Sequence, residues 1–125
     1  MLNGMHHVAV IASDEKRAMD FYVNKLGFAM ERETWRPAQQ DYLRMLRLGD
    51  TVIELFIHPD APQRVTQPEA LGLRHLAFRV ADITAARDWL NARGIETEPI
   101  RDDTANGGHY VFFRDPDGLP LELHD

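Results

Sequence analysis

The sequence predicts an α+β fold in which a βαβββ module is written twice, and two observations carry that prediction. Each half of the chain contains a strand-like run, a helix-like run and three further strand-like runs, in the same order. Residues of matching type also recur 68 positions apart, which is the mark of an internal repeat. The matching pairs are His7 and His75, Asp14 and Asp82, Asp20 and Asp88, and Glu54 and Glu122.

The first half begins with a β-rich run, HHVAVIA, that ends at Ser13-Asp14, a good helix N-cap signal. Gly27 is a natural residue to follow the last turn of the helix. Between these signals, the apolar residues at helical spacing are Ala18, Phe21, Tyr22 and Leu26. The predicted elements are a strand over 6–12, a helix over 15–27, and strands over 28–35, 42–48 and 51–57.

The second half repeats this order, with Asp82 before its helix and Gly94 after it. Trp89 of this helix is expected in the core, as are Phe21 and Tyr22 of the first. The predicted elements are a strand over 74–80, a helix over 83–94, and strands over 95–101, 109–114 and 119–125. We therefore expect a single domain over 1–125, with module 1 over about 5–57, a connector over 58–72 and module 2 over about 73–125.

Composition excludes several classes of protein. A chain of 125 residues is large enough for one domain with a core of its own. The absence of cysteine excludes disulfides and thiolate-based zinc or redox chemistry. The net charge of −6, without a basic run, argues against a nucleic-acid partner. No signal pattern and no apolar run of the roughly 20 residues that span a bilayer are present, so the expected location is cytoplasmic.

Strand alternation suggests a role for the repeated histidines and glutamates. Glu54 points away from Ile53 and Leu55, as Glu122 does from its leucine neighbours, and His7 and His75 likewise oppose apolar positions. A carboxylate with apolar neighbours is costly unless it is paired or binds a metal. One such histidine alone is more often structural than a ligand, but two His and two Glu together suit a first-row divalent cation. Ni, Co, Mn, Fe and Zn all fit such a set.

From HHVAVIASD to FFRDPDGLPLELHD the chain resembles the vicinal oxygen chelate superfamily, the glyoxalase/bleomycin resistance/dioxygenase family. The resemblance covers nearly the whole chain. It implies that the βαβββ modules form a cupped mixed sheet around a metal site. By position, the family's metal ligands correspond to His7, Glu54, His75 and Glu122.

The resemblance also suggests a reaction. The His/Glu/His/Glu set is most similar to that of glyoxalase I, which implies a metal-dependent lyase or isomerase acting on a small molecule beside a carbonyl. Glu122, and Glu54 as its repeat mate, are the candidate catalytic residues, because in glyoxalase I a glutamate carries the proton. Two alternatives stay open: a thiol or other group transferase acting on a small toxic molecule, and a resistance protein that only binds its ligand.

Two departures from glyoxalase I bear on the substrate. Ile11 and His58 stand where that family has glutathione-contacting Arg and Asn, so glutathione specificity does not follow. Arg79, which shares the face of His75, and His58 are the candidate substrate contacts. Family members complete the cup within one chain or across a homodimer, and the open sheet edges favour a homodimer here.

Overall fold

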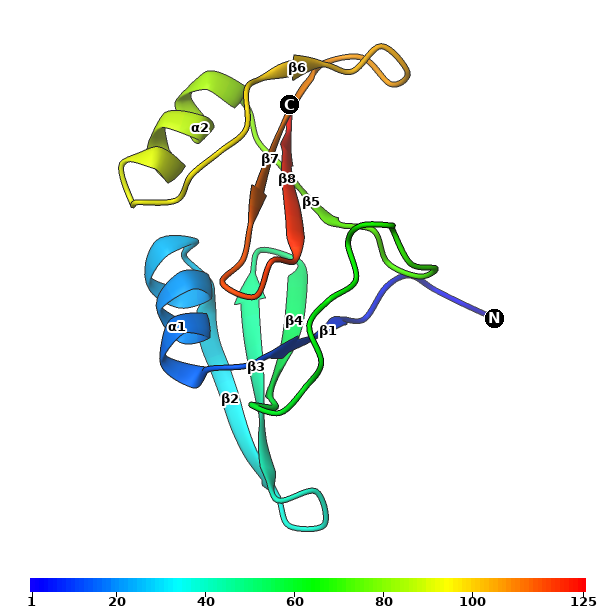
Figure 1. The fold of residues 1–125 in the computed structure, drawn as a ribbon, viewed down its shortest axis with the longest axis vertical. Helices are drawn as coiled ribbons and strands as arrows, with labels where there is room; N and C mark the ends of the chain where they lie inside the picture. Colours follow the sequence, from blue (N-terminus) through cyan, green and yellow to red (C-terminus); the bar gives the residue numbers. More distant parts are fainter. The chain divides into compact units, whose positions relative to one another are not determined.

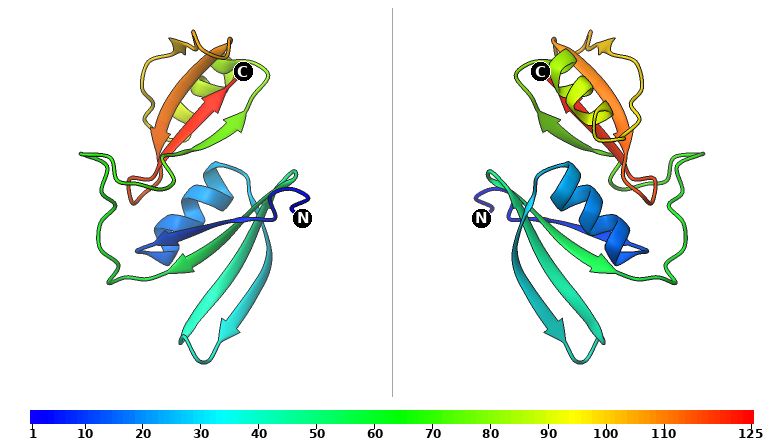
Figure 2. Two further views of the ribbon diagram at one scale, coloured as in Figure 1. Left: turned by 90° about the vertical axis from the view of Figure 1, so that its right-hand side faces the viewer. Right: turned by 90° about the vertical axis from the view of Figure 1, so that its left-hand side faces the viewer.

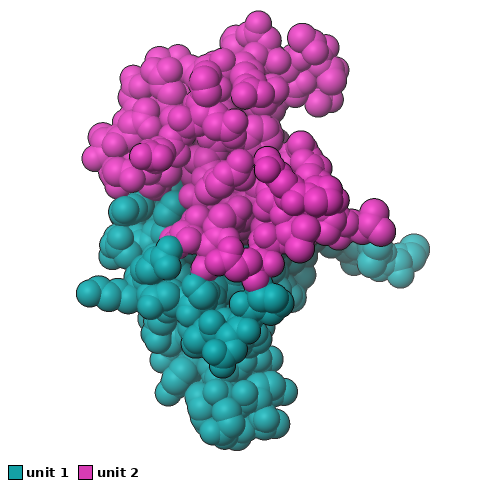
Figure 3. Space-filling model, in the orientation of Figure 1, with its two compact units in different colours: residues 1–62 teal, residues 63–125 magenta.

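The computed structural model describes residues 1–125 and divides into two compact units, residues 1–62 and 63–125 (Figure 3). Each unit contains one four-stranded mixed sheet. The strand order is β1-β4-β3-β2 in the first sheet and β5-β8-β7-β6 in the second. The predicted α+β fold with two βαβββ modules is therefore confirmed. None of the helices has the length and apolar character needed to cross a membrane.

The helices and strands follow one another as the sequence suggests (Figure 1). In the first unit they are β1 (Val8–Ala12), α1 (Glu15–Met19), the π-helical segment η1 (Asp20–Lys25), β2 (Ala29–Arg36), β3 (Asp41–Leu48) and β4 (Thr51–Ile57). In the second unit they are β5 (Leu76–Arg79), α2 (Ile83–Asn91), β6 (Arg101–Asp102), β7 (His109–Arg114) and β8 (Pro120–His124).

Both helices begin where the sequence places a cap. The carboxylate of Asp14 accepts a hydrogen bond from the backbone N–H of Arg17, and that of Asp82 accepts one from Ala85. Each bond satisfies one of the free N–H groups of a first helical turn. The first helix differs from the prediction in one respect, because its second half widens into η1.

The repeat extends to the strand register. β1 runs parallel to β4 with Ala9 opposite Glu54, and β5 runs parallel to β8 with Ala77 opposite Glu122. These partners are themselves 68 positions apart, so the spacing found in the sequence is a spacing in the sheets.

One face of each sheet packs against the helix of its own unit (Figure 2). In the first unit that face buries Leu46, Ile53 and Leu55 completely, together with Tyr22 of η1. In the second unit the fully or nearly fully buried residues are Leu90, Val111, Phe113 and Leu121. We call the opposite face, which no helix of the same unit covers, the open face of each sheet. Strand alternation places Glu54 and Glu122 on it.

Two predictions about the second unit are wrong. The strand expected over 95–101 is reduced to a single bridge at Thr97 and the two residues of β6, because Pro99 has no N–H for a ladder. Trp89 is 41% exposed and is not a core residue. It precedes the buried Leu90 by one position, about 100° around the helix, and its ring stacks under the Arg93 guanidinium at 3.8 Å.

Candidate metal centre

The first unit brings His7 and Glu54 together on its open face. His7 lies immediately before β1, and Glu54 lies in the middle of the neighbouring strand β4. The two side chains approach with 3.2 Å between His7 Nε2 and Glu54 Oε2. Glu54 is mostly buried, with 16% of its side chain exposed, so its charge needs a partner.

The second unit repeats the arrangement with His75 and Glu122. His75 lies immediately before β5, and its Nε2 atom is 3.2 Å from Glu122 Oε2. The Glu122 side chain is 12% exposed. Phe112, the register partner of Glu122 on β7, meets the His75 ring edge to face at 5.1 Å between ring centroids. Each unit therefore carries one histidine–glutamate pair with the same separation.

This separation suits two ligands of one cation. Neighbouring N and O ligands at right angles, with bonds of about 2.1 Å, lie about 3.0 Å apart. The second ring nitrogen of His75, Nδ1, is buried without a hydrogen-bond partner, so the contact with Glu122 at Nε2 is the polar contact that the ring makes. Neither unit alone gathers three or more His, Asp or Glu side chains around one point. Each pair thus offers two ligands of the kinds that divalent cations bind.

A contact that the sequence analysis missed orients His7. The Nδ1 atoms of His6 and His7 are 2.8 Å apart, so one ring donates to the other. This contact occupies Nδ1 of His7 and leaves Nε2 directed at Glu54. Histidines that bind metals commonly use their second nitrogen in this way. Strand alternation gives no signal for such a contact, because neighbouring residues are expected on opposite faces.

His58, a predicted substrate contact, belongs to a charged cluster on the open face of the first sheet. Arg36 donates two hydrogen bonds to Asp41, at 2.7 and 2.6 Å, and His58 Nε2 lies 3.2 Å from the same carboxylate. The Arg36 guanidinium also covers the Phe56 ring at 4.6 Å. The hydrogen bonds from Arg36 lower the pKa of the Asp41 carboxyl below its usual value. Sequence reasoning missed Asp41, because its role depends on the pairing of β2 with β3.

Two other polar residues of the second sheet, Arg79 and His124, pair with each other in register. Arg79, the other predicted substrate contact, is exposed on β5, where it pairs in register with His124. His124 is engaged elsewhere, with its Nε2 3.0 Å from Asp103 and its Nδ1 2.8 Å from the Asp125 carbonyl oxygen. The hydrogen bond to Asp103 raises the pKa of His124. The histidine next to Glu122 in the structure is therefore His75.

Comparison with known proteins agrees with this architecture. Residues 4–123 match the Glyoxalase/Bleomycin resistance protein/Dioxygenase superfamily. The chain belongs to this superfamily. It is 51% identical to YwkD of Bacillus subtilis, over 100% of this chain and 98% of that one, and 46% identical to YaeR of Escherichia coli, over 99% and 97%. A crystal structure of a glyoxalase family protein from Enterococcus faecalis is 50% identical, covers 98% of each chain and superposes with a TM-score of 0.93.

Other members of the superfamily carry names that specify a reaction. They include 2-epi-5-epi-valiolone epimerase of an Actinomyces species, at 31% identity, and a probable lactoylglutathione lyase of Vibrio cholerae, at 29%. Metallothiol transferase FosB of Shouchella clausii is 27% identical. FosX of Listeria monocytogenes, 18% identical with a TM-score of 0.73, has been crystallised with Mn(II). The superfamily therefore contains lyases, epimerases and transferases, and members that bind divalent metal ions.

The Asp41 cluster predicts a pH dependence of stability. A carboxyl whose pKa is lowered by folding stabilises the folded protein at any pH above the pKa that the group has in the unfolded chain, about 3.9. The stabilisation is lost as the pH falls through the lower folded value. Asp41→Asn should therefore be less stable than the parent at neutral pH, and the difference should shrink below about pH 4. Urea unfolding followed across this range measures both effects.

The matched control is Asp60→Asn, because Asp60 is exposed and has no recorded partner. It should follow the parent at every pH. An Asp41→Asn protein with the parent's stability at neutral pH would show that the cluster contributes nothing to folding.

Proposed function

We propose that this protein is a metal-dependent lyase or isomerase of the glyoxalase I type, which moves a proton next to a carbonyl of a small substrate. The observation that carries the proposal is the repeated pair, His7 with Glu54 and His75 with Glu122, each at 3.2 Å. Relatives named as an epimerase and as a probable lactoylglutathione lyase support this class of reaction. A group transferase such as FosB is the competing class, and the fourth ligand, Glu54, counts against it.

In this proposal all four residues bind one divalent cation, with Ni, Co, Mn, Fe and Zn as the candidates. Imidazole nitrogen and carboxylate oxygen are both suitable ligands for these ions. A cation held there would polarise a substrate carbonyl and acidify the adjacent C–H bond. Each unit supplies half of the ligands, so the complete site requires both halves from one chain or from two chains.

Glu122 carries the proton. Its side chain is 12% exposed and lies 3.2 Å from His75 Nε2, so the carboxylate is held in one place, as a general base must be. With a substrate bound, Glu122 would lie beside the C–H bond next to the carbonyl, where it would accept the proton and return it to the neighbouring carbon. Glu54 is the second candidate base, because its exposure and its contact with histidine are nearly the same.

The protein is also proposed to work as a homodimer. The sheets end at β1 and β2 in the first unit and at β5 and β6 in the second, which leaves edges able to pair with another chain. The superfamily often forms dimers and acts on small molecules. In an exchanged dimer, His7 and Glu54 of one chain would complete the site with His75 and Glu122 of the other.

The metal prediction is tested by elemental analysis after loading with each candidate ion. We expect about one ion per chain, because each chain supplies one full ligand set. His75→Ala and His7→Ala should each weaken binding more than about 100-fold, since losing even an outer partner of a ligand costs 10- to 100-fold. His109→Ala is the control, because His109 contacts Asp102 and Asp125. Equal metal content in all four proteins would exclude the site.

The proton-transfer prediction is tested by exchange of the substrate C–H with deuterium in D₂O, followed by NMR on a panel of 2-oxoaldehyde hemithioacetals and acyl-CoA thioesters. Glu122→Gln keeps an oxygen ligand and nearly the same shape but removes the base. It should retain metal and lose exchange by about 10² or more, the range of a general base. Glu54→Gln is the matched variant. Exchange at the parental rate in Glu122→Gln would assign the base to another residue.

The assembly prediction is tested by light scattering at micromolar concentration. We expect the mass of two chains, because open sheet edges and divided ligand sets both favour association. A mass of 14.4 kDa, that of one chain, would exclude the dimer and leave the metal prediction standing.

A further inference from the structure

A cavity in the second unit is lined in part by His75, the partner of Glu122. Its volume is about 580 Å³, within the range of small-molecule sites. One wall is the connector over residues 64–72, and the other is the open face of the second sheet, including His75 and Phe112. Every lining residue belongs to the second unit.

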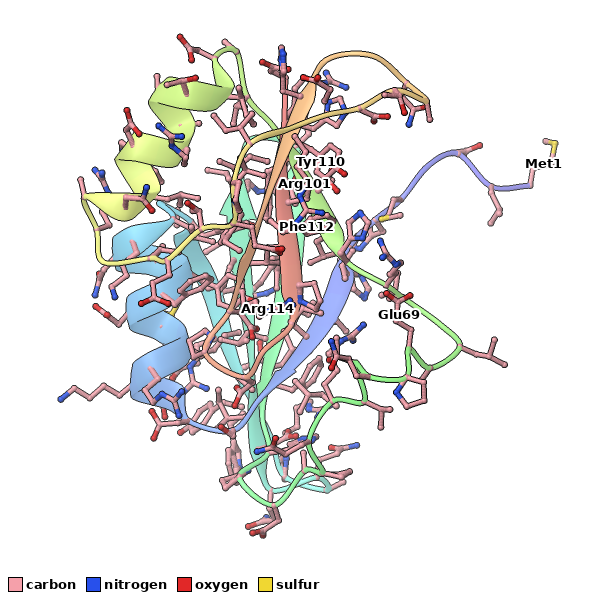
Figure 4. The ribbon with its side chains drawn as sticks, turned by 45° about the horizontal axis from the view of Figure 1, so that its top comes forward. Met1, Glu69, Arg101, Tyr110, Phe112 and Arg114 are labelled. Atoms are coloured by element: carbon pink, nitrogen blue, oxygen red, sulfur yellow. The ribbon has the colours of Figure 1, made fainter.

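The cavity is positively charged although the chain carries a net charge of −6. Four arginines line it, Arg64, Arg74, Arg101 and Arg114, against two glutamates, Glu69 and Glu98. Figure 4 shows Arg101, Tyr110, Phe112 and Arg114 along β6 and β7, with Glu69 on the connector. The excess of arginine over glutamate favours a ligand with negative charge.

Two of the four guanidinium groups already have strong partners. Arg64 donates to the backbone carbonyls of Leu73 and Arg74, at 2.6 and 3.1 Å. These bonds join the connector to the residues that follow it. Arg74 donates to both carboxylate oxygens of Glu69, at 3.0 and 2.9 Å. These arginines build the wall of the cavity.

The other two are available for a ligand. Arg101 has one long contact, 3.5 Å from Glu98, and Arg114 has no recorded hydrogen bond or ion pair. Register places both on the open face, since Arg101 pairs with Tyr110 and Arg114 lies two positions beyond Phe112. Arg47 holds the equivalent position in the first sheet. It pairs with Val52, Arg114 pairs with Pro120, and Val52 and Pro120 are 68 positions apart. Arg47 is already paired with Glu31 at 2.8 Å.

We propose that Arg101 and Arg114 bind an oxyanion group of the substrate, a carboxylate or a phosphate, in this cavity. A guanidinium suits either group, because its N–H donors match two oxygens at once. The inference rests on the proposed function in one respect, which is that the reacting carbons lie at the His75–Glu122 pair. It assigns the substrate class: a small molecule with an anionic end beside its reacting carbonyl.

The test is an NMR titration of the ¹⁵N-labelled, metal-free protein at low ionic strength, once with inorganic phosphate and once with malonate. We expect saturable shifts in the amides of β7 and of residues 98–101 with at least one probe. Tighter binding of phosphate identifies a phosphorylated or phosphonate substrate, and tighter binding of malonate identifies a carboxylate. The titration involves neither metal nor turnover, so its result does not depend on the outcome of the metal and exchange experiments. A failure of the proposed function and a failure of this inference can therefore be told apart.

Variants assign the binding to the two arginines. Arg101→Gln and Arg114→Gln should each weaken binding about tenfold, the loss of one charge-assisted contact. Arg47→Gln is the matched control, because Arg47 holds the equivalent register position and is already paired. It should bind as the parent does. No saturable shift with either probe, or parental affinity in both cavity variants, would overturn the proposal.

Discussion

The parallel pairing of the first and last strands of each module is the constraint on which the site depends. It sets Ala9 opposite Glu54 and Ala77 opposite Glu122, with the histidine two positions before each alanine. Histidine, alanine and glutamate then lie on one face, because side chains alternate along a strand. The alanine side chain is small, which leaves room for the carboxylate and the imidazole to approach to 3.2 Å in both units. A larger side chain at Ala9 or Ala77 would occupy that gap.

The same pairing is held in place by the core. The neighbours of the two glutamates are fully buried on the helix face: Ile53 and Leu55, which flank Glu54, and Leu121, which precedes Glu122. A slip of one residue would expose these side chains, each of which contributes about 1.5–3 kcal/mol when buried, and would turn a carboxylate into the core. The stability of the fold and the position of the histidine–glutamate pair therefore depend on a single register in each sheet. The alternation that is visible in the sequence therefore also predicts which histidine and which glutamate share a face.

Elements with strong alternation were predictable to the residue. The strands over 51–57 and 109–114 have the bounds that the pattern predicts. The failures have local causes: Pro99 interrupts a ladder, and Trp89 lies beside the buried stripe of its helix and not on it. Asp41 was missed because its partners come from cross-strand register, which one sequence does not display. The arginine cavity was missed because its connector wall has no periodicity. The joining of the two pairs into one site stays a prediction.

The two modules agree at the histidine–glutamate pairs and differ around them, and that difference bears on the proposed substrate. Arg47 and Arg114 occupy equivalent register positions, yet Arg47 is neutralised by Glu31 while Arg114 is unpaired in a basic cavity. The first unit has its own charged cluster at Asp41, where both Arg36 and His58 are bound to the carboxylate. If the proposed cation is held by two equivalent pairs, its ligands are the same on both sides and do not favour either orientation of a substrate. The orientation of the substrate must therefore be set by residues that differ between the two modules. Among these, Arg101 and Arg114 suit an anionic group better than Arg36 and Arg47, which are already bound to carboxylates.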